Sequence, residues 1–352
     1  MSDEKINIIG LMSGTSLDGL DIVYVTFDKN NYKNFKIQCS ETKPYSKLWK
    51  EKLAKAIDKS DKELVELNDE YGELLAEKVN NFIKENNIIT INFIASHGHT
   101  ILHQPEKGIT LQIGNGQILA SETQHKVVCD FRTQDVKLGG QGAPLVPIGD
   151  EFLFPQYDAC LNLGGFANVS FREENKRIAF DICPVNIVLN HYINKLGYDF
   201  DDKGHLASSG ITDIELLQEL NSLCFYKMNY PKSLGLEWVQ STIFTLIDEY
   251  NIEIKDVLRT FIEHVAIQIV NSTKKCKNLF ITGGGVFNEF LIKRIEHYSN
   301  LEIIIPDSQT INYKEALIFA FLGLLRVDNQ VNCLSSVTGA EKDHSSGVIF
   351  LA

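Results

Sequence analysis

The sequence predicts an α/β protein built from two related halves. The main observation is a strand–turn–strand pattern that occurs twice, at residues 6–27 and again at 160–171. Amphipathic helical segments alternate with short apolar strands through the rest of the chain, as is typical of α/β folds. The length of 352 residues agrees, because a domain usually takes roughly 100–200 residues.

The first half opens on an apolar strand at 6–12, a turn of small residues at 13–19 and an alternating strand at 20–27. The pair Asp18-Gly19 is common in tight hairpins. Helical periodicity follows at 49–59 and 62–84, and further strands are expected at 92–96, 110–113 and 127–129.

The second half repeats the opening and then alternates helices with strands. Strands at 160–163, 169–171 and 177–180 surround a Gly-rich turn, and the last of them leads into Asp181. Helices are expected at 186–196, 214–223, 238–249, 254–273, 287–298 and 313–326, with strands at 278–282 and 302–305. We place the junction in the loop at 139–144, which gives domains 1–150 and 151–352, with the last helix able to pack back on the first half.

Composition excludes several classes of protein. A hydrophobic fraction of 44% excludes intrinsic disorder. The net charge of −12, without a basic stripe, argues against a nucleic acid or an anionic membrane as partner. The seven cysteines are scattered and form no C-x-x-C pair, which argues against a disulfide framework and a structural zinc site.

Neither a signal peptide nor a membrane-spanning helix is expected from the sequence. The first five residues lack the profile of a signal peptide, and the most apolar helical run, at 316–325, is too short to span a bilayer. We therefore expect a cytoplasmic protein.

Three loops rich in Gly, Ser, Thr and Asn follow strands, at 13–19, 164–168 and 283–285. Such loops expose backbone N–H groups without bulk, as phosphate binding requires. The chain has neither a P-loop sequence nor a strand-linked G-x-G-x-x-G.

The motifs along the chain resemble those of the anhydro-N-acetylmuramic acid kinases. They are LMSGTSLDG at 11–19, SHGHT at 96–100, TLQIG at 110–114, DFR at 130–132 with Asp135, GGQGAPLVP at 139–147, NLGGFAN at 162–168, PKS at 231–233 with Gly235 and Glu237, GGG at 283–285 with Asn288, and Glu315-Ala316. The resemblance implies the fold of the sugar kinase, Hsp70 and actin superfamily. That fold has two ribonuclease-H-like (actin-like ATPase) domains with a nucleotide and substrate cleft between them.

Three motifs depart from the family's pattern, and in PKSLGLE at 231–237 Leu234 and Leu236 replace Thr and Arg. His99 replaces a Gln in S-H-G-Q-T, and an imidazole there is expected to titrate near neutrality. The family's F-D-T-G-P-G-N is FDICPVN at 180–186, so Cys183 and Val185 replace two glycines and remove backbone freedom beside Asp181.

The resemblance implies an ATP-dependent kinase of peptidoglycan recycling. The family phosphorylates O6 of 1,6-anhydro-N-acetylmuramic acid while water opens the anhydro bridge, giving N-acetylmuramic acid 6-phosphate. Asp181 is the implied general base for that water. Capping of the helix at 186 is the alternative role for this carboxylate.

The resemblance also implies where ATP and Mg²⁺ bind. Asp18 is the expected metal ligand, and its alternative role is hairpin chemistry. The other expected nucleotide-side residues are Gly14, Thr15, Ser16, Leu17, Gly19, Leu20, Asp21, Gly164, Gly165, Gly283, Gly284, Gly285 and Asn288.

The substrate-side candidates are Ser13, His97, Gln112, Arg132 and Glu315. Arg132 suits the lactyl carboxylate, because guanidinium pairs bidentately with carboxylate. Three structural alternatives stay open. In these alternatives, His97 would be a core histidine and Arg132 would bridge Asp130 or Asp135. Independently, Glu315 would serve only as an acid in the first turn of the last helix.

Two other functions remain open at this point. One is a related sugar kinase that phosphorylates an open hydroxyl without opening a ring. The other is a non-enzymatic, actin-like ATP-binding module. The expected partner is a small anhydro amino sugar, and the resemblance suggests a homodimer.

Overall fold

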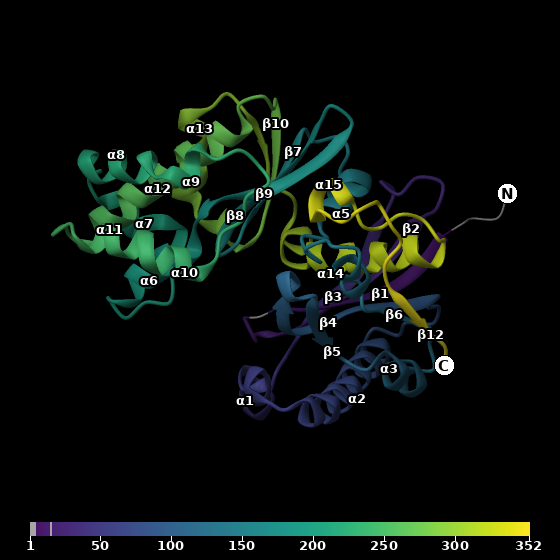
Figure 1. Cartoon of the computed structure of the whole chain (residues 1–352). Helices are drawn as coiled ribbons and strands as arrows, with labels where there is room; N and C mark the ends of the chain where they lie inside the picture. The colour runs from purple at the N-terminus through teal and green to yellow at the C-terminus, as the bar shows by residue number, and fades with distance from the viewer. Residues whose placement is uncertain (1–4, 15) are drawn as a thin grey trace. The chain divides into compact units, whose positions relative to one another are not determined.

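The computed structural model describes residues 5–14 and 16–352, which divide into two compact units. Unit 1 runs to Pro155 and resumes at Tyr313, whereas unit 2 spans Gln156–Asn312 (Figure 1). The loop at 139–144 therefore lies inside unit 1 rather than at the junction, and residues 313–352 group with unit 1.

The sheet of unit 1 begins with an antiparallel meander and continues in parallel. Strands β1 (Lys5–Ser13), β2 (Gly19–Asp28) and β3 (Lys36–Pro44) pair antiparallel in sequence. Strand β4 (Phe93–Gln104) lies parallel to β1, and β6 (Val127–Cys129) lies parallel to β4. Strands β5 (Ile109–Ile113) and β12 (Val348–Phe350) add antiparallel to β4 and β6.

The sheet of unit 2 repeats this arrangement. Its members are β7 (Ala159–Leu163), β8 (Phe166–Glu173), β9 (Lys176–Pro184), β10 (Asn278–Thr282) and β11 (Glu302–Ile304). They lie in the order β11-β10-β7-β8-β9, with an antiparallel β7-β8-β9 meander and a parallel β7-β10-β11 side. The central order β6-β4-β1-β2-β3 of unit 1 is the same. The prediction of two related, ribonuclease-H-like α/β halves is confirmed.

Helices cover both faces of the sheet in unit 1 (Figure 1). Ile9, Leu11 and Ile22 pack with the buried stripe of α2 (Asp61–Glu85), which begins at a Ser60 capping box. On the other face, α14 (Ser308–Val327) approaches β1 so closely that a Cβ at Gly10 would lie 2.2 Å from the Ala316 carbonyl oxygen. The remaining helices are α1 (Lys47–Ala54), α3 (Gly116–Thr123), α4 (Thr133–Lys137), α5 (Pro147–Leu153) and α15 (Ser335–Thr338).

In unit 2, α12 (Ile254–Thr273) is largely buried and packs against α6 (Asn186–Asn194) and β9. The other helices are α7 (His205–Ser209), α8 (Ile214–Ser222), α9 (Cys224–Lys227), α10 (Leu236–Trp238), α11 (Thr245–Asp248) and α13 (Glu289–Tyr298). The helix expected at 238–249 is interrupted, because residues 239–244 form a π-helical turn between α10 and α11.

Several elements differ from the prediction, and one strand was missed. Strand β3 was not predicted, because Lys36–Pro44 is polar and lies at the edge of the sheet, where pairing with β2 rather than burial holds it. The strand expected at 92–96 continues to Gln104, and α14 starts at Ser308 rather than at residue 313.

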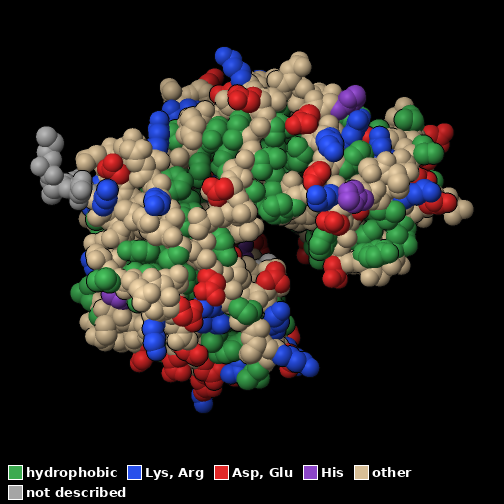
Figure 2. Space-filling view, turned by 180° about the vertical axis from the view of Figure 1, so that it is seen from behind, with side chains coloured by type: hydrophobic (Ala, Val, Ile, Leu, Met, Phe, Trp, Pro, Cys, Tyr) green, Lys and Arg blue, Asp and Glu red, His purple; other side chains and the backbone are tan. Residues whose placement is uncertain are grey.

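Basic and acidic side chains are interspersed on the face drawn in Figure 2. Within residues 5–14 and 16–352, no helix has both the length and the apolarity that crossing a membrane requires.

Candidate active site

Asp181 lies on β9 of unit 2, and both of its carboxylate oxygens are held. Oδ2 accepts a hydrogen bond from the Leu234 backbone N–H at 2.8 Å, and Oδ1 accepts one from the Asn168 amide. Burial raises the pKa of Asp181 above 3.8, while these two hydrogen bonds oppose the rise. The carboxylate is therefore fixed in position and more basic than an exposed aspartate.

Asp181 does not cap a helix, which removes the alternative role considered above. The residue at the N-terminal cap of α6 is Val185, and no side chain caps that helix. Pairing of β8 with β9 shifts register between Ala167 and Asn168, so a bulge lies directly beside the carboxylate.

The side chains that depart from the family motif fill core volume. Cys183 and Val185 are fully buried in the core of unit 2, and neither has a positive φ. Val185 has φ −132° and ψ −96°, outside the regular helical and extended regions.

The segment at 231–234 holds Asp181, a role that was not predicted for it. The Asp181 N–H donates to the Lys232 carbonyl at 3.1 Å, next to the bond from Leu234. Lys232 lies over the Phe225 and Phe180 rings, at 4.6 and 5.6 Å. The PKS motif was the only available signal, and it gave no indication of which group it would contact.

Most backbone N–H and C=O groups of Gly164 and Gly165, in the second hairpin, form hydrogen bonds within the protein. The Gly165 carbonyl accepts from Val185 and Ile187 at 2.7 and 3.3 Å, and the Gly164 N–H donates to Phe166 at 3.0 Å. The N–H of the exposed Gly165 is the donor that this turn can offer to a phosphate oxygen.

The third glycine loop needs glycine at its first position. Gly283 has φ +87°, and a Cβ there would lie 2.6 Å from Asn162 Oδ1 and 2.8 Å from the Leu163 carbonyl oxygen. A short 3₁₀ turn at 284–287 follows, and Asn288 caps α13 by accepting from the Leu291 N–H at 3.0 Å.

Substitution of Gly283 by Ala should cost about 1–3 kcal/mol of unfolding free energy, because it adds both backbone strain and overlap with buried atoms. The apparent KM for ATP should rise as well, since the loop is displaced. Urea unfolding and steady-state kinetics measure the two effects. For the unfolding free energy, Gly284→Ala is the matched control, because a Cβ there meets no atom within 4 Å. Equal losses of unfolding free energy in both variants would contradict the argument.

The first hairpin carries Asp18, the expected metal ligand, and Asp21, an expected nucleotide-side residue. Leu17 has φ +60°, an uncommon conformation for a branched residue that points to a functional constraint. Asp18 is exposed at the turn, and Asp21 lies on β2 with its carboxylate accepting from Thr42 at 2.6 Å. Burial raises the pKa of Asp21, and the negative charge of Asp18 raises it further. Thr15 lies outside the described residues.

Ser13, at the end of β1, belongs to a buried chain of hydroxyl groups. Tyr45 donates to Ser13 Oγ at 2.8 Å, so the 2.6 Å contact between the Tyr45 and Tyr71 hydroxyls has Tyr71 as donor. Ser13 Oγ also lies 2.9 Å from His99 Nδ1. Burial lowers the pKa of His99 to about 4, so the expectation that it titrates near neutrality is wrong.

The lowered pKa of His99 predicts a pH-dependent stability. The unfolded chain binds the proton at about pH 6.5 and the folded chain only at about pH 4, so stability falls as pH drops through that window. His99→Gln should remove about 2–3 kcal/mol of this pH dependence. Urea unfolding at pH 4.5 and 7 measures it, with the exposed His297→Gln as control. An unchanged difference between the two pH values would contradict the assignment.

Arg132 and His97 form a fixed pair in unit 1. Arg132 Nε donates to His97 Nε2 at 3.0 Å, so His97 Nδ1 carries the proton and donates to the Gly98 carbonyl at 3.0 Å. Burial lowers the pKa of His97, and the Arg132 charge lowers it further. Both ring nitrogens are thus used inside the protein, and His97 positions Arg132.

The guanidinium of Arg132 keeps one nitrogen for a ligand. Nη1 donates to the Gly142 carbonyl at 2.5 Å, and Nη2 donates to no group among the described residues. Burial lowers the pKa of Arg132 only to about 10, so it is charged at neutral pH. Among those residues it forms no ion pair with Asp130 or Asp135, which removes the bridging alternative.

Glu315 and Gln112 complete the unit 1 side. Glu315 is exposed in the interior of α14 rather than in its first turn, so the first-turn alternative is wrong. The negative charge of Glu315 raises the pKa of Arg132, against the effect of burial. The two charges are therefore close enough to interact. Gln112 on β5 donates to Thr110 at 2.9 Å, and its amide oxygen is available as an acceptor.

A family model and several named relatives match nearly the whole length of this chain. The model of the family described as "Anhydro-N-acetylmuramic acid kinase" matches residues 6–352. Relatives of that name from Pseudomonas syringae pv. syringae and Mannheimia succiniciproducens are 34% and 33% identical, covering 98% and 97% of this chain and 99% and 98% of their own. A xylulose kinase of Lactobacillus acidophilus aligns with a TM-score of 0.44 and 13% identity over 98% of this chain and 93% of its own. The chain belongs to the anhydro-N-acetylmuramic acid kinase family.

Proposed function

We propose that this protein phosphorylates O6 of 1,6-anhydro-N-acetylmuramic acid with ATP while water opens the anhydro bridge. The product is N-acetylmuramic acid 6-phosphate, and the reaction serves peptidoglycan recycling. The observation that carries the proposal is the Asp181 carboxylate, held by two donors in a chain that matches the family from residue 6 to 352.

Asp181 is the general base. An ionised carboxylate accepts hydrogen bonds only, and each Asp181 oxygen keeps a lone-pair direction beyond the one used by Asn168 or Leu234. A water bound there loses its proton to the carboxylate as it attacks C1 of the sugar. The raised pKa makes Asp181 a better proton acceptor than an exposed aspartate.

The sugar is held by unit 1 groups. The free Nη2 of Arg132 donates to the lactyl carboxylate, which suits a charge-assisted hydrogen bond. The Gln112 amide oxygen and the exposed Glu315 carboxylate offer further polar contacts to the hydroxyl and acetamido groups. The buried Ser13 hydroxyl is engaged by Tyr45 and His99, so it keeps one lone pair for the sugar.

ATP binds with a divalent cation at the first hairpin loop. Asp18 and Asp21 supply the oxygen ligands that Mg²⁺ prefers. The charge of Asp18 raises the pKa of Asp21, and a cation bound beside them would offset this repulsion between the two carboxylates. The cation supplies charge neutralisation for the phosphoryl group. Gly14, Gly165 and Gly284 leave room for close approach of the nucleotide, because a Cβ at each would meet no protein atom closer than 3.7 Å. Gly283 and Gly285 instead allow the loop to pack closely on Leu163.

We place the reaction in the cytoplasm. All seven cysteines are free, and three of them, Cys39, Cys224 and Cys276, are not buried, which suits a reducing compartment.

Mass spectrometry of the products made in ¹⁸O-labelled water tests the proposal. With ATP, Mg²⁺ and the anhydro sugar, the product should gain one phosphate and one solvent oxygen together. A phosphorylated product that lacks solvent oxygen would overturn the ring-opening chemistry and favour a kinase that acts on an open hydroxyl. Absence of any phosphorylated sugar would favour a non-enzymatic ATP-binding module.

A further inference from the structure

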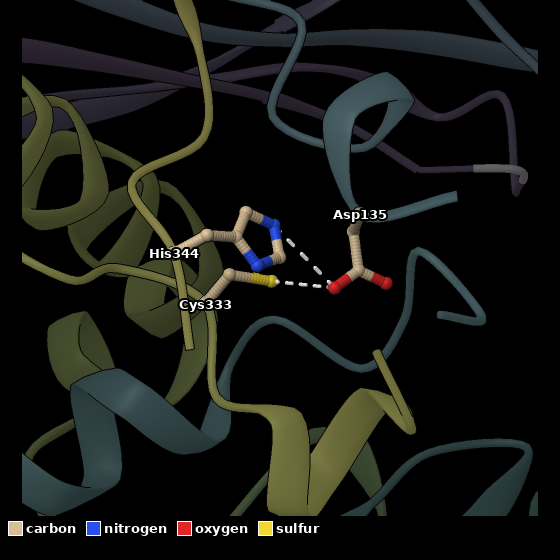
Figure 3. A group of neighbouring side chains, drawn as sticks. All are labelled: Asp135, Cys333 and His344. Carbon is tan, nitrogen blue, oxygen red and sulfur yellow. Dashed lines mark hydrogen bonds and ion pairs between the residues drawn. The ribbon is translucent and has the colours of Figure 1, made fainter. Parts of the chain in front are cut away.

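A thiol, an imidazole and a carboxylate meet in the interior of unit 1, outside the groups assigned above (Figure 3). Asp135 comes from α4, whereas Cys333 and His344 pair with each other in the C-terminal segment. Asp135 Oδ1 lies 3.1 Å from Cys333 Sγ and 3.5 Å from His344 Nε2. All three potential ligand atoms lie within 4.8 Å of one another.

The imidazole of His344 is buried with a nitrogen left open. Its Nδ1 lies 3.1 Å from the Lys342 carbonyl oxygen, which fixes the ring, while Nε2 points at Asp135. Nε2 has no hydrogen-bond partner among the described residues, although the side chain is only 4% exposed. A buried nitrogen without a partner is costly and calls for an explanation. A bound cation would supply that partner.

The carboxylate of Asp135 is held in place by the surrounding chain. Oδ1 accepts from the Thr338 hydroxyl at 2.7 Å, and Oδ2 accepts from the Gly142 N–H at 2.7 Å. A Cβ at Gly140 would lie 2.2 Å from Oδ2, so the turn closes tightly around the carboxylate. This support fixes the carboxylate, as outer contacts do around metal ligands.

The chemistry of the three ligands selects the ion. Sulfur and imidazole nitrogen favour Zn²⁺ or Co²⁺ over Mg²⁺, which prefers oxygen. Tetrahedral zinc with bonds of about 2.0–2.3 Å needs ligand atoms about 3.3–3.7 Å apart, close to the two separations given above. A thiolate, a carboxylate and a divalent cation also sum to zero charge, which suits a buried site.

We propose that Asp135, Cys333 and His344 bind one Zn²⁺, with water at the fourth position. Binding breaks the Cys333 S–H bond, forms a Zn–S bond and releases the proton to solvent. Because Asp135 holds the Gly142 N–H and Arg132 donates to the Gly142 carbonyl, the ion ties the C-terminal segment to the loop that positions Arg132. Asp135 lies 198 residues before Cys333, and His344 is farther still along the chain. No spacing of cysteines in the sequence could therefore indicate the site.

Cobalt titration of the chelator-treated full-length protein tests the proposal. One Co²⁺ per chain should produce a thiolate-to-cobalt charge-transfer band, and Zn²⁺ should abolish it. Cys333→Ser should lose the band. Cys224→Ser should keep it, because Cys224 is exposed and lies outside the cluster. The cobalt band does not depend on kinase activity. Failure of the metal proposal can therefore be distinguished from failure of the proposed kinase function.

A second variant covers the case in which Cys333→Ser fails to fold. His344→Gln keeps the thiol and should bind Co²⁺ more than about 10-fold more weakly, since even outer partners of a metal site are worth 10–100-fold. A wild-type protein that takes up no Co²⁺, or a band that is unchanged in Cys333→Ser or His344→Gln, would overturn the proposal.

Discussion

Asp181→Asn should lower kcat about 10²–10⁴-fold, the usual contribution of a general base. An amide does not accept the proton of the attacking water. Phosphorylation and opening of the anhydro bridge should fail together, because the proposed reaction couples them. Coupled assays of ADP release and mass spectrometry of the sugar measure both. A variant that still phosphorylates the anhydro sugar at nearly the wild-type rate would show that another group is the base.

The pH profile gives an independent check on the same carboxylate. Asp181 must be ionised to act, so activity should fall as pH drops through its pKa. Burial raises that pKa, so the acid limb of kcat/KM should lie above pH 3.8. The residual activity of Asp181→Asn should lack this limb.

The control for this substitution has to separate chemistry from folding. Both partners of Asp181 are donors, so an amide in its place satisfies only one of them. Asn168→Ala leaves the carboxylate intact and removes one donor. It should lose less kcat than Asp181→Asn, about 10–100-fold, because a hydrogen bond to an ionised carboxylate contributes about 1.5–3 kcal/mol and the Leu234 N–H still holds the other oxygen. Equal losses in both variants would mean that Asp181 acts by holding structure.

Local patterns were sufficient to predict most of the fold. The two hairpins, the stripe of α2 and the strands that end in glycine loops each carry their signal within a few residues. Strand β3 carried none, because an edge strand held by pairing needs no apolar face.

The partners of the candidate residues were not predictable in the same way. Leu234 lies 53 residues from Asp181 and His97 lies 35 residues from Arg132, so only the folded chain shows that each pair is bonded. The pKa of His99 was misjudged for a related reason. Burial beside Tyr71 in the middle of β4 disfavours the charge of His99, and no motif encodes that burial.

Arg132→Lys should raise KM for the anhydro sugar about 10–100-fold and leave KM for ATP nearly unchanged. Lysine keeps the charge but has no planar fork, so it cannot donate at once to His97, to Gly142 and to a carboxylate. A hydrogen bond to a charged group contributes about 1.5–3 kcal/mol, and each 1.4 kcal/mol is tenfold in affinity. Steady-state kinetics with each substrate varied in turn measures the effect.

Two comparisons isolate the carboxylate contact from general damage. Arg326 also donates to a backbone carbonyl, that of Gly347 at 2.7 Å, and lies outside the proposed site, so Arg326→Lys should leave KM for the sugar unchanged. An anhydro amino sugar without the lactyl group offers Arg132 no carboxylate. In the wild type, KM should be lower for the sugar with the lactyl group than for the sugar without it. Arg132→Lys should reduce this difference in KM, because only the lactyl-bearing sugar loses a contact. If both sugars weaken by the same factor, Arg132 acts through the Gly142 loop and the carboxylate is bound elsewhere.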